Sequence, residues 1–430
     1  MKRRLVLALA ILALAASGLA LVGYLAWPAV PDPPAPDLAG IDPAIRSAVE
    51  QAQAEVRQSP RSADAWGKLG MVFTSHIFGD EAMACFAQAE QLDPDDPRWP
   101  YHQALIHLAY DPPAALPKLE RAVDLCGAKT DGPRVRLAEL QLSLGEWDAA
   151  REHFEILLQA DARHPRALLG LARIDFQAGR LDASRRNLQT ALSDARTRKA
   201  ALILSAEIRQ RMGDASGARQ ERATTLGLRD DPAWPDPYTA ELAKLSVGES
   251  ARLKVAAKLL DLNQHTEAIG LMQKIAQDYP RSANAWTQLG WAQLGRGQIA
   301  AAEQSLDTAL ALQPENARAN RFKGICRQEQ KDCPQAIVYF KKAIAAKPSY
   351  LESHINLGLC LKEEGDPGAA IAAFQDALRC QPLSALSHAE LGALLLQQGR
   401  DDEAVFHLQQ AVELRPDDAA SRKLLEGAKK

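Results

Sequence analysis

Residues 283–316 read ANAWTQLGWAQLGRGQIAAAEQSLDTALALQPEN, and residues 317–350 read ARANRFKGICRQEQKDCPQAIVYFKKAIAAKPSY. Both are copies of one 34-residue unit, which recurs twice more up to residue 418. Position 8 is always glycine, positions 20 and 27 are always alanine, and position 32 is always proline. The glycines are Gly290, Gly324, Gly358 and Gly392, and the prolines are Pro314, Pro348, Pro382 and Pro416. A fixed period of this kind indicates a repeat architecture.

Each unit is predicted to form two helices. Apolar or small residues recur at positions 4, 7, 8 and 11 and again at 20, 24 and 27, which are the spacings of amphipathic helices. Small residues at positions 8 and 20 let the two helices approach closely, and the proline at 32 ends the second helix. A single hairpin cannot bury its apolar face alone, so we expect stacked hairpins in an all-α solenoid.

The period, the small residues and the proline together resemble the tetratricopeptide repeat (TPR) family. Weaker copies extend the pattern over most of the chain. We expect an N-terminal array over residues 41–230, a junction rich in proline and aromatic residues at 231–248, and a C-terminal array over 249–418. The predicted units are 63–96, 97–130, 131–164, 165–198 and 199–230, then 249–282, 283–316, 317–350, 351–384 and 385–418. Residues 419–430 are expected to form a terminal capping helix.

The N-terminal segment reads as a membrane anchor. Lys2, Arg3 and Arg4 precede an apolar run over residues 5–27, which is long enough to span a bilayer. The basic cluster should stay cytoplasmic and place the rest of the chain outside, in the periplasm of a bacterium. The alternative is a signal sequence cleaved near the small residues 15–18, which would release the protein into the periplasm. Residues 28–40 are rich in proline and predict a stiff spacer.

Two further stretches bear on location. Residues 98–101 (RWPY) and 234–238 (WPDPY) resemble features of membrane-anchored envelope TPR proteins of some bacteria. That resemblance implies a place in the cell envelope rather than an activity.

The sequence shows no sign of catalysis or of a cofactor. It has no glycine-rich phosphate loop, no HExxH, no CxxC and no GxSxG motif. Its formal net charge of −3, without a basic block beyond the N-terminus, does not favour a nucleic-acid partner. We therefore expect a protein that is not an enzyme.

Two histidines and two cysteines have the spacing of a possible site. His354 and His388 share position 4 of adjacent units, where a metal site is conceivable, but Trp286 fills the same slot, so packing is the expected role. Cys326 and Cys333 flank one interhelix turn and could form a disulfide outside the cytoplasm. The sequence leaves that pairing open.

The TPR resemblance implies that positions 2, 5, 9 and 12 of each first helix face the concave groove. In the C-terminal array, this register predicts an apolar row of Trp291, Ile325 and Leu359. The row would be bordered by Arg318, Arg321, Asn356 and Lys362. The alternative is that Trp291 and its neighbours pack between repeats. In the N-terminal array, position 9 alternates through Glu139, Arg173 and Glu207, and these charges are expected to neutralise one another.

The sequence thus predicts a non-catalytic interaction scaffold tethered to the membrane. Its partner would be a peptide or helix with apolar anchors and some acidic character, bound along the C-terminal row. The alternative function is that of an accessory factor for assembling envelope complexes, of the cytochrome-maturation or secretion type. An enzyme with an unrecognised site is the third possibility.

Overall fold

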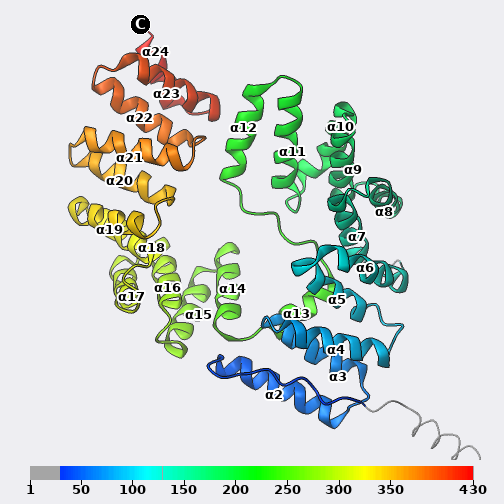
Figure 1. Ribbon diagram of the computed structural model, residues 1–430. Coiled ribbons are helices and arrows are strands. Elements are labelled where there is room, and N and C mark those ends of the chain that lie inside the picture. The colour runs from blue at the N-terminus through cyan, green and yellow to red at the C-terminus, as the bar shows by residue number, and fades with distance from the viewer. Residues whose placement is uncertain (1–29, 128, 430) are drawn as a thin grey trace, which may run out of the picture. The chain divides into compact units, whose positions relative to one another are not determined.

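The computed structural model describes residues 30–127 and 129–429, and within these ranges the chain forms 23 α-helices and no strand (Figure 1). This confirms the predicted all-α class and the helical hairpins. The expected anchor, residues 1–27, lies outside the described ranges. Among the described residues, none of the helices has the length and apolar character needed to cross a membrane.

The chain divides into two compact units. The first contains α2 to α6 together with the short helix α13. Their bounds are α2 Pro43–Gln58, α3 Ala63–Ser75, α4 Gly79–Leu92, α5 Arg98–Tyr110, α6 Pro112–Cys126 and α13 Pro237–Leu245. Leu242 and Leu245 of α13 pack against a core that includes Trp66, Phe73 and Phe86.

The second unit contains α7 to α12 and α14 to α24. The first group is α7 Gly132–Leu144, α8 Trp147–Ala160, α9 Pro165–Gln177, α10 Leu181–Ser193, α11 Arg198–Arg211 and α12 Ala215–Leu226. The next is α14 Gly248–Asp261, α15 His265–Asp278, α16 Ala283–Gly295, α17 Ile299–Leu312, α18 Ala317–Glu329 and α19 Cys333–Ala346. The last is α20 Leu351–Glu363, α21 Pro367–Cys380, α22 Ala385–Gln397, α23 Asp401–Leu414 and α24 Ala419–Ala428.

The two compact units do not follow the expected division into arrays before and after residues 231–248. Helix α13 lies inside that stretch and joins the first unit through its apolar face, whereas α7 to α12 belong with α14 to α24. The division into two arrays therefore stays a prediction about the repeats rather than a description of the compact units.

Hairpin packing depends on the glycine at position 8. A Cβ placed on Gly358 would lie 2.8 Å from the ring of Phe374, which occupies position 24 of the same unit. Gly324 faces Phe340 in the same way, and Gly290 faces Leu306. A glycine at this position is expected to let the two helix backbones approach closely. The structure shows that the missing Cβ chiefly makes room for the large side chain at position 24.

Neighbouring repeats are joined by a hydrogen bond from position 4. The ring nitrogens of Trp286 and His354 lie 3.0 and 2.8 Å from the carbonyl oxygens of Pro280 and Pro348, the prolines that end the preceding units. His388 and Pro382 repeat the arrangement at 3.1 Å. The two histidines thus fill the slot that Trp286 fills, as the sequence indicated.

None of the six cysteines, all of which lie in the described ranges, forms a disulfide. Cys326 and Cys333 are buried and not bonded to each other, and the Cys333 thiol donates a hydrogen bond of 3.0 Å to Glu363. The disulfide left open by the sequence is therefore absent from the structure.

Candidate functional site

The predicted row in the C-terminal repeats is only partly accessible. Trp291 of α16 is 36% exposed and stacks on Phe322 with ring centres 6.4 Å apart. Ile325 and Leu359 are half-buried and pack against clusters that join successive hairpins. Trp291 therefore offers an exposed ring, whereas Ile325 and Leu359 pack between repeats, and the row as a binding site stays a prediction.

The polar residues around this row already have neighbours. The guanidinium carbons of Arg318 and Arg321 lie 5.9 and 5.3 Å from the centre of the Phe322 ring. Lys362 forms an ion pair of 2.6 Å with Glu390. Asn356 is half-buried on the same helix as Lys362. The pairing of Lys362 was not foreseen, since Glu390 comes from the next hairpin.

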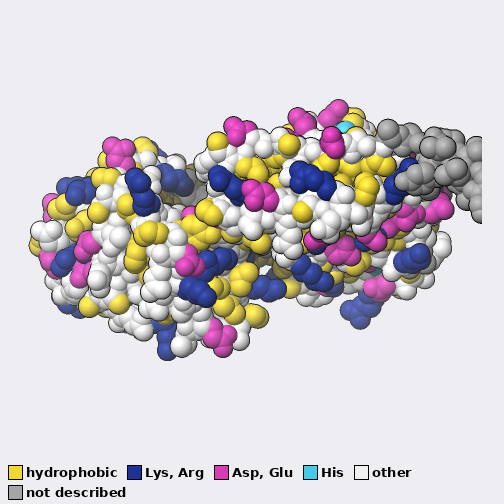
Figure 2. Space-filling view, turned by 90° about the horizontal axis from the view of Figure 1, so that it is seen from below, with side chains coloured by type: hydrophobic (Ala, Val, Ile, Leu, Met, Phe, Trp, Pro, Cys, Tyr) yellow, Lys and Arg dark blue, Asp and Glu magenta, His cyan; other side chains and the backbone are white. Residues whose placement is uncertain are grey.

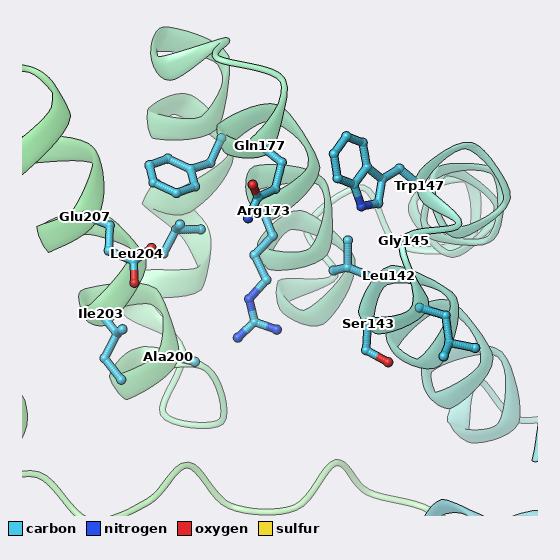
Figure 3. Close-up of a pocket in the computed structure, with 12 residues that line it drawn as sticks. Leu142, Ser143, Gly145, Trp147, Arg173, Gln177, Ala200, Ile203, Leu204 and Glu207 are labelled. Atoms are coloured by element: carbon cyan, nitrogen blue, oxygen red, sulfur yellow. The ribbon is translucent and has the colours of Figure 1, made fainter. Parts of the chain in front are cut away.

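A distinct hollow of about 560 Å³ lies among the first helices of the N-terminal repeats, between α7, α9 and α11 (Figure 3). It is lined by Leu142, Ser143, Leu144, Gly145, Trp147, Arg173, Phe176, Gln177, Ala200, Ile203, Leu204 and Glu207. We call it the Arg173 groove. Many of these residues stand at positions 2, 5, 9 and 12 of their units, the register that the family resemblance assigns to a concave surface.

Arg173 extends into the centre of this groove. Figure 3 shows its side chain between Ile203 and Glu207 on one side and Leu142 and Ser143 on the other. No described residue forms a hydrogen bond or an ion pair with its guanidinium. Displacement of water by the surrounding groups lowers the pKa of Arg173, but an arginine stays charged near neutral pH. The groove therefore holds a cation without a direct partner.

The expected neutralisation along position 9 is not realised as direct pairing. Glu139 instead forms an ion pair of 2.9 Å with Arg166, a residue at position 2 of the next unit. Position 9 alone could not reveal this, because Arg166 and Arg173 lie on one helix and compete for the same carboxylate.

Apolar side chains surround the charged centre of the groove. Trp147 is 42% exposed, Ile203 is 45% exposed and Leu144 is 39% exposed. Tryptophan and arginine are enriched among the residues that contribute most of the binding energy in protein interfaces. The sequence contained a signal for this site, since Ile203 and Leu142 stand at groove positions 5 and 12 beside the charged residues.

An extended segment lies on the same helices. Residues 229–236, which we call the strap, have no regular secondary structure and run past the N-terminal ends of α7, α9 and α11. The indole of Trp234 donates a hydrogen bond of 3.0 Å to Asp131, and its ring lies 4.5 Å from that of His164. A hydrogen bond with His164 is the main reason why the pKa of Asp131 lies below its usual value. The strap and the Arg173 groove meet at Ala200.

Charge is mixed elsewhere on the surface. On the face shown in Figure 2, acidic and basic side chains of the described residues are interspersed with hydrophobic and neutral ones. Among the described residues, no cluster of three or more His, Cys, Asp or Glu side chains is arranged to hold a metal ion.

Comparisons with known proteins point to one family. One tetratricopeptide-repeat model matches residues 145–208 and 259–326, and a second model of the same description matches residues 352–419. No curated protein matches the chain.

Several solved structures are similar to parts of the chain. MamA from Desulfovibrio magneticus RS-1 is 22% identical over 40% of this chain and 97% of its own, with a TM-score of 0.36. YrrB, described as a TPR protein with an unusual peptide-binding site, is 18% identical over 44% of this chain and 98% of its own, with a TM-score of 0.36. The APC/C hetero-tetramer Cut9-Hcn1 is 14% identical over 90% of this chain and 94% of its own, with a TM-score of 0.41.

The same helical hairpins, at a spacing of about 34 residues, also form residues 63–144, which neither model matches. The protein is a tetratricopeptide-repeat protein.

Proposed function

We propose that this protein is a non-catalytic scaffold that binds a segment of another protein in the Arg173 groove. Tetratricopeptide repeats generally act as protein-interaction scaffolds, because stacked hairpins create extended concave surfaces. The observation that carries the proposal is the unpaired Arg173 in a hollow edged by Trp147 and Ile203. A partner segment should offer a carboxylate to Arg173 and an apolar side chain to this edge.

The predicted row of Trp291, Ile325 and Leu359 remains a second proposed surface. The exposure of Trp291 supports it, and the packing of Ile325 and Leu359 and the pairing of Lys362 weigh against it. We therefore place the main contact in the N-terminal repeats.

We also propose that the scaffold is tethered to a membrane through residues 5–27, with its repeats on the extracytoplasmic side. The support is the basic cluster Lys2-Arg3-Arg4 followed by an apolar run and a proline-rich spacer. Cleavage of that run would instead release the protein into the periplasm. In a role in assembling envelope complexes, the same groove would bind one dedicated partner protein.

A displayed library of random peptides tests the binding site. Selection on the wild-type chain should enrich sequences that combine an acidic residue with apolar ones. Arg173→Glu should weaken the binding of the selected peptides by at least about tenfold. The reason is that a buried or half-buried contact between a guanidinium and a carboxylate contributes about 2 kcal/mol or more to binding.

The matched control is Arg186→Glu, which reverses the charge of an exposed residue on α10 of the same repeat. It should leave the selected peptides bound. Trp291→Ala tests the second surface in parallel. If Trp291→Ala abolishes binding and Arg173→Glu does not, the groove assignment is wrong and the C-terminal row is the site.

A further inference from the structure

We propose that the strap, residues 229–236, is a peptide ligand bound in cis, and that its site on α7, α9 and α11 also accepts an external segment of the same chemistry. That segment is extended and acidic and carries a tryptophan followed by a proline. The inference deepens the proposed function by naming a partner class for the same face, and its contacts share only Ala200 with the lining of the Arg173 groove.

The backbone of the strap resembles that of a bound peptide. It has no regular secondary structure, and its residues 229–235 take part in none of the backbone–backbone hydrogen bonds of the described chain. Pro232, Ala233 and Pro235 are exposed, whereas Asp231 and Trp234 are half-buried and Asp236 is buried. A few anchoring side chains separated by exposed prolines are typical of extended peptides held in a groove.

The first anchor is a carboxylate at a helix N-terminus. Asp231 accepts hydrogen bonds of 2.8 and 2.9 Å from the backbone N–H groups of Lys199 and Ala200. These residues belong to the first turn of α11, whose N-cap residue Thr197 makes no side-chain capping bond. The strap therefore supplies the cap that the helix itself lacks. Arg166 adds a weaker bond of 3.5 Å to the carbonyl oxygen of Pro232.

The second anchor is the tryptophan slot. The ring of Trp234 lies against His164, and the guanidinium carbon of Arg196 lies 4.4 Å from its centre. The indole N–H donates a hydrogen bond to Asp131. Aromatic stacking, a cation over the ring face and a hydrogen bond at its edge together specify tryptophan over other aromatic residues.

The walls of the slot are held without the strap. His164 accepts a bond of 3.1 Å from the backbone N–H of Ala167 through Nδ1, which leaves its Nε2–H to donate to Asp131 at 3.1 Å. Arg196 is fixed by an ion pair of 2.6 Å with Asp194. Because these groups are oriented by their own repeats, the slot should persist when Trp234 leaves it. A preformed slot lowers the cost of binding a replacement segment.

The test uses the full chain and a fluorescent peptide with the sequence of residues 229–237, RDDPAWPDP. The peptide should bind the variant Trp234→Ala at least about tenfold more tightly than the wild type, whose own tryptophan competes at high effective concentration. A peptide with alanine in place of its tryptophan should bind neither protein. Adding Arg196→Ala to Trp234→Ala removes a wall of the slot and should abolish the binding.

Folding and location are controlled separately. Circular dichroism checks that Trp234→Ala keeps its helix content. If it does not, the titration is repeated with Asp231→Asn, which leaves the ring in place but weakens the first anchor and should still increase peptide binding over the wild type. Ile203→Asp in the Trp234→Ala background disrupts only the Arg173 groove and should leave peptide binding intact.

Three outcomes would overturn the proposal. The peptide could fail to bind a folded Trp234→Ala chain, or it could bind wild type and variant equally. The wild type could also dimerise with rising concentration while the free peptide does not bind, which would assign the slot to exchange of straps between two copies. None of these outcomes bears on the peptides selected through Arg173, so failure here is distinguishable from failure of the proposed function.

Discussion

Position 4 of the repeat shows how one physical requirement admits several residue types. Trp286, His354 and Asn320 all bring a side-chain nitrogen to the carbonyl oxygen of the proline that ends the preceding unit, at 3.0, 2.8 and 2.9 Å. The shared property is an N–H donor with sufficient reach. A tryptophan, an asparagine and a histidine at this position therefore have the same structural role.

We expect His102 of α5 to make the first repeats sensitive to acid. Its ring is fully buried, stacks on Phe86 with ring centres 5.0 Å apart, and neither ring nitrogen has a hydrogen-bond partner in the described chain. Burial, followed by the charge of Arg98, lowers the pKa of His102 from 6.5 to about 4. Below pH 6.5 the unfolded chain therefore binds a proton that the folded chain does not.

We predict that the free energy of unfolding falls as the pH is lowered from 6.5 to 4, by roughly 3 kcal/mol from this residue alone. His102→Leu should remove that share of the pH dependence. Urea unfolding monitored by tryptophan fluorescence at several pH values measures it. Parallel profiles for the variant and the wild type would show that His102 is not responsible.

Ile77 occupies a backbone conformation that suits glycine. Its φ is 69°, in the left-handed region, and its side chain is 84% exposed. Gly145 holds φ 83° at the same position of a later unit. A β-branched residue in this region is strained, and the exposed side chain of Ile77 offers little packing in return.

Ile77→Gly should therefore raise the free energy of unfolding by about 1 kcal/mol, after allowance for the greater freedom of glycine in the unfolded chain. Gly145→Ala is the reverse control and should lower it by a similar amount. The midpoint of chemical denaturation measures both changes. A lower midpoint for Ile77→Gly would mean that the isoleucine makes a stabilising contact.

At the scale of a helix pair, replacing glycine with alanine should have opposite effects on the free energy of unfolding at two positions. A Cβ on Gly358 would lie 2.8 Å from the ring of Phe374. Gly270 lies within α15, is exposed, and has open space where a Cβ would be. The first glycine is required by packing and the second is only a weak helix former.

We predict that Gly358→Ala lowers the free energy of unfolding by about 1–3 kcal/mol, because it overpacks the hairpin. Gly270→Ala should raise it by about 0.5–1 kcal/mol through helix propensity. Hydrogen exchange should place the loss at Gly358 in its own and the adjacent repeats, since repeats couple mainly to their neighbours. A uniform loosening of all repeats would contradict the assigned register.

At the scale of the whole molecule, the proposed tether can be tested by extraction. The protein should sediment with membranes, require detergent for release and begin at or near Met1. Leu14→Arg places a charge within the apolar run and should weaken insertion by about 3 kcal/mol. A mature start near Gly18 in the supernatant of the wild type would establish cleavage instead.

Much of the architecture was predictable because it depends on short-range contacts. The period, the glycine at 8 and the proline at 32 predicted the hairpins of residues 283–418, and the structure contains them at α16 to α23. Each of these contacts lies within one unit or joins it to the next, so the same spacing repeats along the chain. The expected packing role of His354 and His388 followed from the same register.

The candidate site depended on contacts that the period does not contain. Trp234 and Asp131 are 103 residues apart, Asp231 and Lys199 are 32 apart, and Lys362 and Glu390 are 28 apart. None of these pairs follows from the spacing of the repeat. The sequence by itself determined a helical repeat protein, because local periodicity specifies each hairpin. Only the tertiary structure decided which charges remain unpaired and where the strap lies, because competition among neighbouring side chains is settled by their positions in space.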